Sequence, residues 1–348
     1  MAEQKKLKVG VVGALGMVGG EMMRTLARRR FPLAGLVPLD LPANAGKEVV
    51  FAGEKLRVRA ATVENFTGLD LALFSAGADA SLKLAPQAVT RGVTVIDNSS
   101  AWRMAEDCPL VVPEVNPEAL RAHRGIIANP NCSTIQMVAV LKPLHDYARI
   151  RRIVVSTYQA VSGAGKRGVA ALEAETRRCL QMAKDAGLEA DHEGFQYRMA
   201  FNILPQIDVF QEGGYTKEEY KMIRETRKIM GDDALKITAT CVRVPVFYGH
   251  SESVNIETER EISPEEARRL LRAAPGITVI DDPDHESYPM PAMSDNEDAI
   301  MVGRIRKDCS VANGLNLWIV SNNIRKGAAL NAVQIAETLI QRGWVGPP

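Results

Sequence analysis

The stretch Leu7-Lys8-Val9-Gly10-Val11-Val12-Gly13-Ala14-Leu15-Gly16-Met17-Val18-Gly19-Gly20 decides the fold of the first part of the chain. An apolar, strand-like run enters a glycine-rich turn, and a helical pattern from Glu21 to Arg29 follows it. Gly13 allows the tight turn, Gly16 lets the backbone approach a pyrophosphate, and Gly19 lets helix and strand pack closely. The stretch therefore predicts a dinucleotide-binding unit. Its spacing is G-x-x-G-x-x-G rather than the commoner G-x-G-x-x-G, so a plain turn without a ligand stays open as the alternative.

Further apolar segments after this unit are typical of buried parallel strands. They are Ala34–Leu39, which runs into Asp40, then Asp70–Ser75 and Val93–Asp97. A helical pattern from Ser81 to Arg91 separates the last two. Strands of this kind alternating with helices predict an α/β, Rossmann-type parallel sheet that is covered on both faces. A ligand crevice is expected beyond the carboxyl ends of the strands, where Ser75, Ala76, Gly77, Ser99 and Ser100 fall.

Size and composition favour an ordinary globular protein with two domains. The chain has 348 residues, 46% of them hydrophobic and 24% charged, and its net charge of +1 gives no field that would attract nucleic acid. Its five cysteines are widely spaced, without a C-x-x-C pair, so neither a metal site nor a disulfide framework is predicted. No apolar run has membrane-spanning length and the N-terminus lacks a signal-peptide pattern, which together predict a cytoplasmic protein.

Cys132 is the candidate nucleophile. It follows an apolar run and the turn Asn129-Pro130-Asn131, and helical spacing begins directly after it. A cysteine at a helix N-terminus meets unpaired N–H groups and the positive end of the helix dipole, which favour the thiolate. Such a thiolate can attack a carbonyl or acyl group. The alternative is a small, buried, structural cysteine.

The second part of the chain has the pattern of a mixed α+β domain. Strands are expected at Arg152–Val161, Ile237–Val246, Ile300–Ile305 and Gly314–Val320, and an extended segment at Met199–Leu204. The small-residue loop Ser162-Gly163-Ala164-Gly165-Lys166 offers N–H groups to a nicotinamide or a phosphate, although a plain loop fits equally well. The last helix, from about Lys326 to Arg342, is amphipathic and is expected to return to the first domain.

Four charged or titratable side chains of this part are candidates for chemistry. Arg243 stands in an apolar strand and needs an anionic partner if it is buried. His250, beside a glycine, can act as general acid or base, and a structural histidine is its competitor. Glu218 and Lys221 share one helix face, where a solvated ion pair is the simplest explanation. Thr216 and Glu219 have capping-box spacing.

A nucleophilic cysteine, a dinucleotide crevice and Gly-His-Ser after an arginine-bearing strand suggest thioester-forming aldehyde or acyl-phosphate chemistry. The sequence closely resembles the bacterial aspartate-β-semialdehyde dehydrogenases over essentially its whole length. The matching motifs are Gly13–Gly19, Asp97–Arg103, Val112–Glu118, Asn129–Thr134, Ser156–Gly165, Phe201–Ile207, Arg243–Ser251 and Ile324–Ala329.

The resemblance implies a reaction and a role for each site residue. Cys132 would attack the acyl carbon of aspartyl-4-phosphate, expel phosphate and form a thioester, which hydride transfer converts to aspartate semialdehyde. This step serves lysine, threonine, methionine and diaminopimelate biosynthesis. His250 would be the general base and later the proton donor, and Gln159 would orient the substrate. Arg243 would bind the α-carboxylate and Glu218 the ammonium group.

The resemblance also implies the remaining contacts and the organisation of the chain. Arg103, Asn131 and Lys221 would hold the leaving phosphate. Residues 1–131 with 324–348 would form the dinucleotide domain, and 132–323 the catalytic and dimerisation domain of a homodimer or a dimer of dimers. No metal is expected. The cofactor, NADP in most relatives, would contact Gly13, Ala14, Leu15, Gly16, Met17, Val18, Asp40, Ser75, Ala76, Gly77, Ser99, Ser162, Gly163 and Asn323.

One segment departs from the family pattern. Most relatives carry a Ser and an Arg before Ala-Gly-Lys, suited to the 2′-phosphate of NADP, whereas this chain has Leu41 and Ala43 there. Asp40 ends the preceding strand, and a carboxylate at that place suits a free ribose 2′-hydroxyl and repels a 2′-phosphate. The sequence therefore predicts that NAD(H) works at least as well as NADP(H). In the alternative, Lys47 or an arginine from elsewhere binds the 2′-phosphate.

Other functions stay open from the sequence alone. An N-acetyl-glutamyl-phosphate reductase has similar architecture, but its substrate lacks the free amine that would give Glu218 a purpose. Glyceraldehyde-phosphate dehydrogenase chemistry fits the surroundings of Cys132 poorly. A non-catalytic dinucleotide-binding protein would be expected to lack Cys132 or His250, and both are present.

Overall fold

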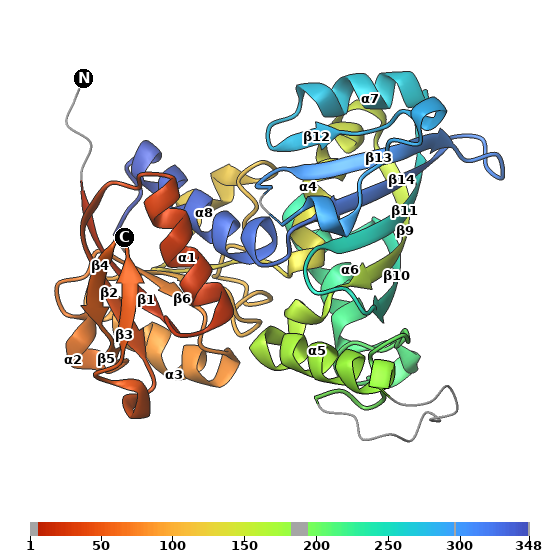
Figure 1. Ribbon diagram of the computed structural model, residues 1–348. Coiled ribbons are helices and arrows are strands. Elements are labelled where there is room, and N and C mark those ends of the chain that lie inside the picture. The colour runs from red at the N-terminus through yellow and green to blue at the C-terminus, as the bar shows by residue number, and fades with distance from the viewer. Residues whose placement is uncertain (1–5, 182–193, 296, 347–348) are drawn as a thin grey trace. The chain divides into compact units, whose positions relative to one another are not determined.

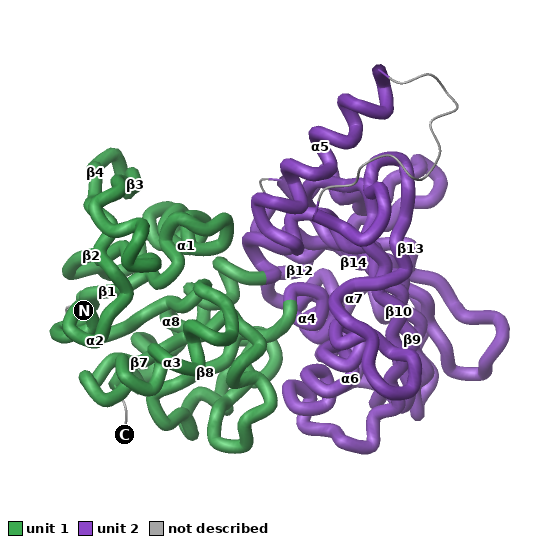
Figure 2. The backbone as a smooth tube through the Cα atoms, turned by 90° about the horizontal axis from the view of Figure 1, so that it is seen from below, with its two compact units in different colours: residues 1–131, 328–348 green, residues 132–327 purple. Residues whose placement is uncertain are grey.

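The computed structural model describes residues 6–181, 194–295 and 297–346. The chain forms two compact units (Figure 2): the first is residues 1–131 with 328–348, and the second is residues 132–327.

The first unit is built on a six-stranded sheet (Figure 1). Its strands are β1 (Leu7–Val12), β2 (Leu33–Asp40), β5 (Arg59–Ala60), β6 (Leu71–Phe74), β7 (Thr94–Asp97) and β8 (Ile126–Ala128), in the order β5-β2-β1-β6-β7-β8. Every pairing in this sheet is parallel. The predicted Rossmann-type parallel sheet is confirmed, and its strand ends place Asp40, Ser75 and Asp97 along one edge.

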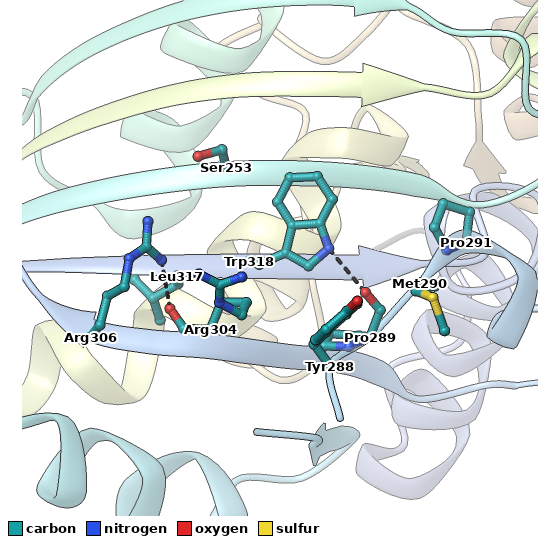
Figure 3. A pocket seen from close by; sticks show the side chains of 9 residues that line it. All are labelled: Ser253, Tyr288, Pro289, Met290, Pro291, Arg304, Arg306, Leu317 and Trp318. Atoms are coloured by element: carbon teal, nitrogen blue, oxygen red, sulfur yellow. Dashed lines mark hydrogen bonds between the residues drawn. The ribbon is translucent and has the colours of Figure 1, made fainter. Parts of the chain in front are cut away.

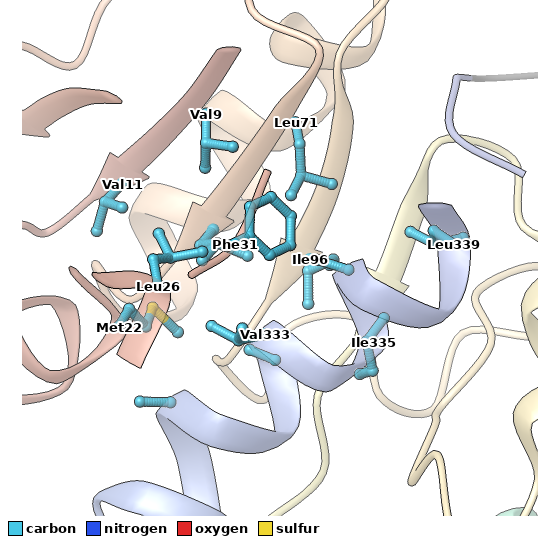
Figure 4. Packing of buried hydrophobic residues seen from close by; sticks show 14 of the residues in the cluster. Val9, Val11, Met22, Leu26, Phe31, Leu71, Ile96, Val333, Ile335 and Leu339 are labelled. Atoms are coloured by element: carbon cyan, nitrogen blue, oxygen red, sulfur yellow. The ribbon is translucent and has the colours of Figure 1, made fainter. Parts of the chain in front are cut away.

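Helices cover both faces of this sheet, as the apolar strands require. One buried cluster joins α1 (Met17–Arg28) and α8 (Leu330–Arg342) to alternate residues of β1 and its neighbours, as Figure 4 shows for Val9, Met22 and Val333. A second cluster packs α2 (Val63–Phe66) and α3 (Ala78–Val89) against the other face, through Phe66 and Phe74 among others. The C-terminal helix thus returns to the first unit, as predicted.

Helix α1 begins at Met17, four positions before the predicted start at Glu21. Gly19 and Gly20, expected in the turn, lie inside its first turn instead. The reason is steric, because a Cβ on Gly19 would lie 2.1 Å from the carbonyl oxygen of Gly13. The small residues let the helix start directly at the glycine turn. A hairpin of β3 (Glu48–Phe51) and β4 (Glu54–Arg57) completes the unit.

The second unit is built on a mixed six-stranded sheet of order β10-β9-β11-β14-β13-β12. Its strands are β9 (Ile150–Gln159), β10 (Lys236–Arg243), β11 (His250–Thr258), β12 (Ile277–Val279), β13 (Ile300–Lys307) and β14 (Gly314–Ser321). Burial alternates along β9, β10 and β11, so one face of the sheet is covered and the other is open. Strand β11 was not predicted, because its polar residues conceal the alternation.

The helices of this unit are α4 (Cys132–Ala148), α5 (Gly165–Gln181), α6 (Lys217–Met230) and α7 (Pro264–Ala273). The predicted capping box is present in α6, where the Thr216 side chain accepts from the Glu219 N–H and Glu219 from the Thr216 N–H. The prediction of an extended segment at Met199–Leu204 is wrong. The chain turns there, and only Leu204 forms a β-bridge, with Arg243. Within the described ranges, no helix has the length and apolarity needed to cross a membrane.

Candidate active site

Helix α4 begins at Cys132, as the sequence predicts. The nucleophile candidate therefore lies in the first turn, where backbone N–H groups and the helix dipole favour a thiolate. The side chain is half-buried. Gly327 packs closely against it, since a Cβ at position 327 would lie 2.9 Å from the Cβ of Cys132. No local pattern singles out Gly327, although it lies in the matching motif Ile324–Ala329.

Three polar side chains meet at one edge of the second sheet. Gln159 and Arg243 end the parallel strands β9 and β10, where they are register partners. His250 begins β11, which runs antiparallel to β9. The ends of β9 and β10 therefore lie beside the start of β11. The side chains of Gln159, Arg243 and His250 are all buried there.

Arg243 is a buried cation. Its Nη1 donates to the carbonyl oxygen of Ala160 at 2.8 Å. Burial lowers the pKa of Arg243, and the negative charges of Glu218 and Cys132 offset part of this. The guanidinium remains charged at neutral pH, so it attracts a thiolate at Cys132.

Gly163 packs closely against both Arg243 and His250, so no side chain fits there. A Cβ at position 163 would lie 2.7 Å from the Arg243 Nη1 and 3.4 Å from the His250 ring. The predicted contact residues Ser162 and Asn323 are buried beside it and hydrogen-bonded to each other, with the Asn323 Nδ2 donating to the Ser162 Oγ at 3.0 Å. The Asn323 Oδ1 also accepts from the Gly249 N–H at 3.0 Å, which fixes the backbone next to His250.

The protonation state of His250 follows from its surroundings. The Ala160 N–H donates to its Nδ1 at 3.0 Å, so the neutral imidazole carries its proton on Nε2. Complete burial, followed by the Arg243 charge, holds the pKa of His250 well below its ordinary value. No hydrogen-bond partner for Nε2 is present in the described part of the chain. The imidazole therefore offers an Nε2–H donor.

Glu218 and Lys221 form the predicted i,i+3 pair, with the Lys221 Nζ 3.0 Å from the Glu218 Oε2. The pair is not a solvated surface pair, because the Glu218 side chain is only 7% exposed and that of Lys221 19%. Gln159 Nε2 donates to the other Glu218 oxygen at 3.3 Å. Lys221 also donates to the Asp208 Oδ2 at 3.0 Å. Asp208 was missed from the sequence, since it lies in an irregular segment with no periodic signal.

Glu252 and Gln136 are a second buried pair that the sequence did not indicate. Glu252 follows His250 by two positions in β11, so both side chains lie on the same face of the sheet. Gln136 lies one helical turn after Cys132 in α4. Burial raises the pKa of Glu252 well above its ordinary value, and Gln136 offsets part of the rise. The Glu252 oxygens lack well-aligned hydrogen-bond partners among the described residues.

The first unit holds a cavity of about 340 Å³ at the carboxyl ends of its strands. Of the residues predicted to contact a cofactor, six line it: Gly13, Leu15, Gly16, Asp40, Ser75 and Ala76. Gly13 has a φ of +82°, and a Cβ there would lie 2.3 Å from the Ser75 carbonyl oxygen. The glycine turn, the helix start after it and this cavity fit a dinucleotide. Ala14, Met17, Val18 and Gly77 flank these lining positions in the sequence.

Asp40 is buried in this cavity wall. Its Oδ2 accepts from the Leu15 N–H at 3.0 Å, and its Oδ1 from the Leu41 N–H at 2.9 Å and the Asn44 side chain at 2.7 Å. The Asn44 Oδ1 in turn accepts from the Lys47 Nζ at 2.7 Å. The carboxylate thus ties the glycine turn to the segment that departs from the family pattern.

The remaining predicted residues also lie in the first unit. Ser99 donates from its Oγ to the buried Asp97 carboxylate. Arg103 is buried and donates from its Nη2 to the Asn98 carbonyl oxygen at 2.9 Å. Asn131 is buried as well. Arg103 and Asn131 therefore belong to the first unit, and Lys221 to the second.

A separate groove of about 410 Å³ lies on the open face of the second sheet (Figure 3). Trp318, Ser253 and Tyr288 are among its lining residues, and the Trp318 Nε1 donates to the Pro289 carbonyl oxygen at 3.0 Å. His250 and Glu252 point to the covered face instead. No cluster of three or more metal-ligating His, Cys, Asp or Glu side chains occurs in the described ranges.

Comparison with known proteins finds a semialdehyde dehydrogenase match in each of the two parts of the chain. A family model described as "Semialdehyde dehydrogenase, NAD binding domain" matches residues 8–123, and one described as "Semialdehyde dehydrogenase, dimerisation domain" matches residues 141–326.

Individual relatives are similar over nearly their full length. An aspartate-semialdehyde dehydrogenase of Aquifex aeolicus is 54% identical, over 97% of this chain and 99% of the relative. Aspartate semialdehyde dehydrogenase II from Vibrio cholerae, solved as a complex with ASA, is 46% identical with a TM-score of 0.92, over 97% of this chain and 99% of that one. The Candida albicans enzyme, solved with NADP, is 26% identical with a TM-score of 0.77, over 98% and 100% of the two chains.

These matches favour aspartate-semialdehyde dehydrogenase over the N-acetyl-glutamyl-phosphate reductase and over a non-catalytic dinucleotide-binding protein. The chain belongs to the aspartate-semialdehyde dehydrogenase family, whose members are NAD(P)-dependent oxidoreductases.

Proposed function

We propose that the chain converts L-aspartyl-4-phosphate to L-aspartate 4-semialdehyde and phosphate, and runs the reverse oxidation when phosphate is present. The reaction would serve lysine, threonine, methionine and diaminopimelate biosynthesis. One observation carries the proposal: in the second unit, the Cys132 thiol at a helix N-terminus interacts with the charge of the buried Arg243, whose guanidinium lies beside the His250 ring across Gly163. This arrangement supports Cys132 as a nucleophile near groups suited to bind a carboxylate and to transfer a proton.

The Cys132 sulfur would attack the acyl carbon of the substrate. A carbon–sulfur bond forms, the carbon–oxygen bond to phosphate breaks, and the phosphate leaves with the electron pair of that bond. A bound reduced nicotinamide supplies the hydride that turns this thioester into the aldehyde. The helix N-terminus and Arg243 favour the thiolate that leaves again at the end.

The buried charges match the two ends of an aspartyl group. Arg243 would bind the α-carboxylate through two N–H donors, which its planar guanidinium allows and a lysine does not. Glu218 would bind the ammonium group. Gln159, which already donates to Glu218, would hold the substrate beside Cys132. Arg103, Asn131 and Lys221 would bind the phosphate.

His250 would act chiefly as a proton donor. Its Nε2–H is suited to donate to the oxygen that gains negative charge when the sulfur attacks. Action as a general base at Nε2 requires this proton to leave first, because the Ala160 N–H occupies Nδ1. The geometry therefore supports the donor role more directly than the base role inferred from the resemblance.

The cofactor cavity supports use of NAD(H) at least as well as NADP(H). Asp40 places a buried carboxylate at the end of β2, where a 2′-hydroxyl is accepted and a 2′-phosphate repelled. Lys47, the alternative phosphate ligand, is held by Asn44. Steady-state kcat/KM with both cofactors tests this. We expect kcat/KM with NADH to equal or exceed kcat/KM with NADPH. A hundredfold preference for NADPH would contradict this proposal.

The variant Lys47→Ala tests the alternative, in which Lys47 binds the 2′-phosphate of NADP. If Lys47 binds a 2′-phosphate, the variant loses kcat/KM with NADPH and keeps it with NADH. If Asp40 alone sets the preference, both values stay near those of the wild type.

We also propose a homodimer formed through the second unit, with a dimer of dimers as the larger assembly. The matching family model for this part is described as a dimerisation domain. The open face of its sheet supports this role, because aromatic side chains gather there. The Tyr158 and Trp318 rings lie 5.4 Å apart on this face, and Tyr288 and Met290 beside them are exposed.

Activity assays test the proposed function. The wild type is expected to oxidise aspartate semialdehyde with NAD⁺ or NADP⁺ only when phosphate is present. Cys132→Ser should abolish this oxidation and leave binding of the reduced cofactor intact. Phosphate-dependent turnover that survives in Cys132→Ser would show that the proposed nucleophile is wrong.

A further inference from the structure

The segment before α6 carries a carboxylate that competes for Lys221. The Asp208 Oδ2 lies 3.0 Å from the Lys221 Nζ, and its other oxygen accepts from the Val209 N–H at 2.9 Å. The Asp208 side chain is 30% exposed and that of Lys221 19%. This ion pair joins a residue of an irregular segment to a residue of the proposed phosphate site.

Lys221 thus forms ion pairs with two carboxylates at once. Its Nζ also lies 3.0 Å from the Glu218 Oε2. Burial alone would lower the pKa of Lys221, but Glu218 and Asp208 together raise it. Burial alone would raise the pKa of Asp208, but its hydrogen bonds with Lys221 and Val209 outweigh this and lower it. With Glu218 also ionised beside Lys221, the three groups carry one negative charge in sum.

A phosphate dianion gains little from Lys221 while two carboxylates pair with it, even though Arg103 and Asn131 also belong to the proposed phosphate site. The substrate ammonium would compensate Glu218, as proposed above, but Asp208 would still occupy Lys221 and repel the phosphate. Full use of Lys221 by the phosphate therefore requires Asp208 to release it. Its partial exposure means that rotation of one side chain into solvent is enough.

Several side chains of the segment around Asp208 are exposed, which leaves room for the Asp208 side chain to rotate. Four large apolar side chains between positions 201 and 210 are exposed by 59% to 65%: Phe201, Ile203, Val209 and Phe210. Asp208 itself has a φ of +67°, which a non-glycine residue adopts at a cost. Low burial is typical of segments that change conformation readily.

We propose that Asp208 is a displaceable counter-ion for Lys221, which occupies the lysine in the absence of phosphate and so weakens the affinity of the enzyme for phosphate. The inference rests on the proposed role of Lys221 as a phosphate ligand. It adds a residue that sets the affinity for the leaving group of the forward reaction and the nucleophile of the reverse reaction.

The test is the KM for inorganic phosphate in the oxidation of aspartate semialdehyde, measured for Asp208→Asn. Glu212→Gln is the matched control, because it removes the same charge from an exposed side chain in the same segment. We expect Asp208→Asn to lower the KM for phosphate by about threefold to fivefold, from the energy of a partly exposed ion pair. Glu212→Gln should change it by less than about twofold, and Asp208→Glu should restore a value near the wild type.

The KM for aspartate semialdehyde separates this effect from a general loss of structure, since it should stay the same in all three variants. An unchanged or raised KM for phosphate in Asp208→Asn would overturn the inference. A wild type without any phosphate-dependent oxidation would instead contradict the proposed function, so the two failures are distinguishable.

Discussion

Burial disfavours the charged forms of two side chains in the second-unit site, the imidazole of His250 and the carboxyl of Glu252. They lie on one face of β11, both fully buried, and burial shifts their pKa values in opposite directions. Burial favours the neutral imidazole by lowering the pKa of His250, and it favours the neutral carboxyl by raising the pKa of Glu252. Charge at the second-unit site is therefore carried by Arg243, Glu218, Lys221 and the Lys221 counter-ion Asp208. The first three are the residues proposed to bind the charged parts of the substrate.

Glu252→Gln is predicted to stabilise the protein above about pH 5. The folded wild type keeps Glu252 protonated, whereas the unfolded chain ionises it near its ordinary pKa of about 4.3. Unfolding then releases a proton, so this residue makes the stability fall as pH rises, by about 1.4 kcal/mol per pH unit, up to the raised pKa of the folded state. Glutamine has the same shape and does not titrate, so the variant lacks this loss.

Chemical denaturation at several pH values measures the effect as the difference in the free energy of unfolding between the variant and the wild type. The difference should grow from pH 5 upward. Glu257→Gln, on the same strand but partly exposed, is the control and should show a nearly constant difference. Parallel curves for Glu252→Gln and the wild type would show that Glu252 is ionised in the folded protein.

At the scale of elements, the start of α6 could be predicted from the sequence, but its contact with strand β10 could not. The capping box of Thr216 and Glu219 is local, so its spacing predicts the helix start. The second Glu219 oxygen accepts from the Cys241 N–H of β10 at 2.9 Å, which no local pattern indicates. One carboxylate thus caps the helix and fixes it to the strand that ends in Arg243.

Glu219→Ala is predicted to lower the free energy of unfolding by about 2–5 kcal/mol, because it leaves two buried N–H groups without an acceptor. It should also raise the KM for aspartate semialdehyde, since Glu218 loses its alignment with Gln159. Glu266→Ala at the same position of α7, where the side chain pairs with Arg269 on the surface, should cost at most about 1 kcal/mol. Equal effects of the two variants on unfolding would contradict the docking role of Glu219.

The same contrast explains what could be predicted and what could not. The parallel sheet of the first unit and Cys132 at the start of α4 both follow from local patterns, and the structure has each of them. Strand β11 was missed because its polar residues conceal the alternation. The Lys221–Asp208 contact was missed because Asp208 lies in an irregular segment with no periodic signal.

At the scale of the whole molecule, one face of the second sheet carries exposed and half-buried side chains along β9 and β11. The prediction concerns Ser253, which is exposed in the middle of this face. Ser253→Arg should convert the homodimer to monomers, because a buried charge without a partner opposes association. Sedimentation at several protein concentrations measures this. Ala174→Arg, on an exposed position of α5, is the control and should remain dimeric.

A dimer that persists in Ser253→Arg would show that the contact between subunits uses another surface. A monomeric wild type would contradict the homodimer itself.

The central claim is that Cys132 carries the aspartyl group as a thioester. Intact-protein and peptide mass spectrometry test it after incubation with aspartate semialdehyde and the oxidised cofactor in the absence of phosphate. The account predicts a mass increase of one aspartyl group, located on Cys132 and discharged when phosphate is added. A protein that turns over without this adduct, or that carries it on another residue, would contradict the account.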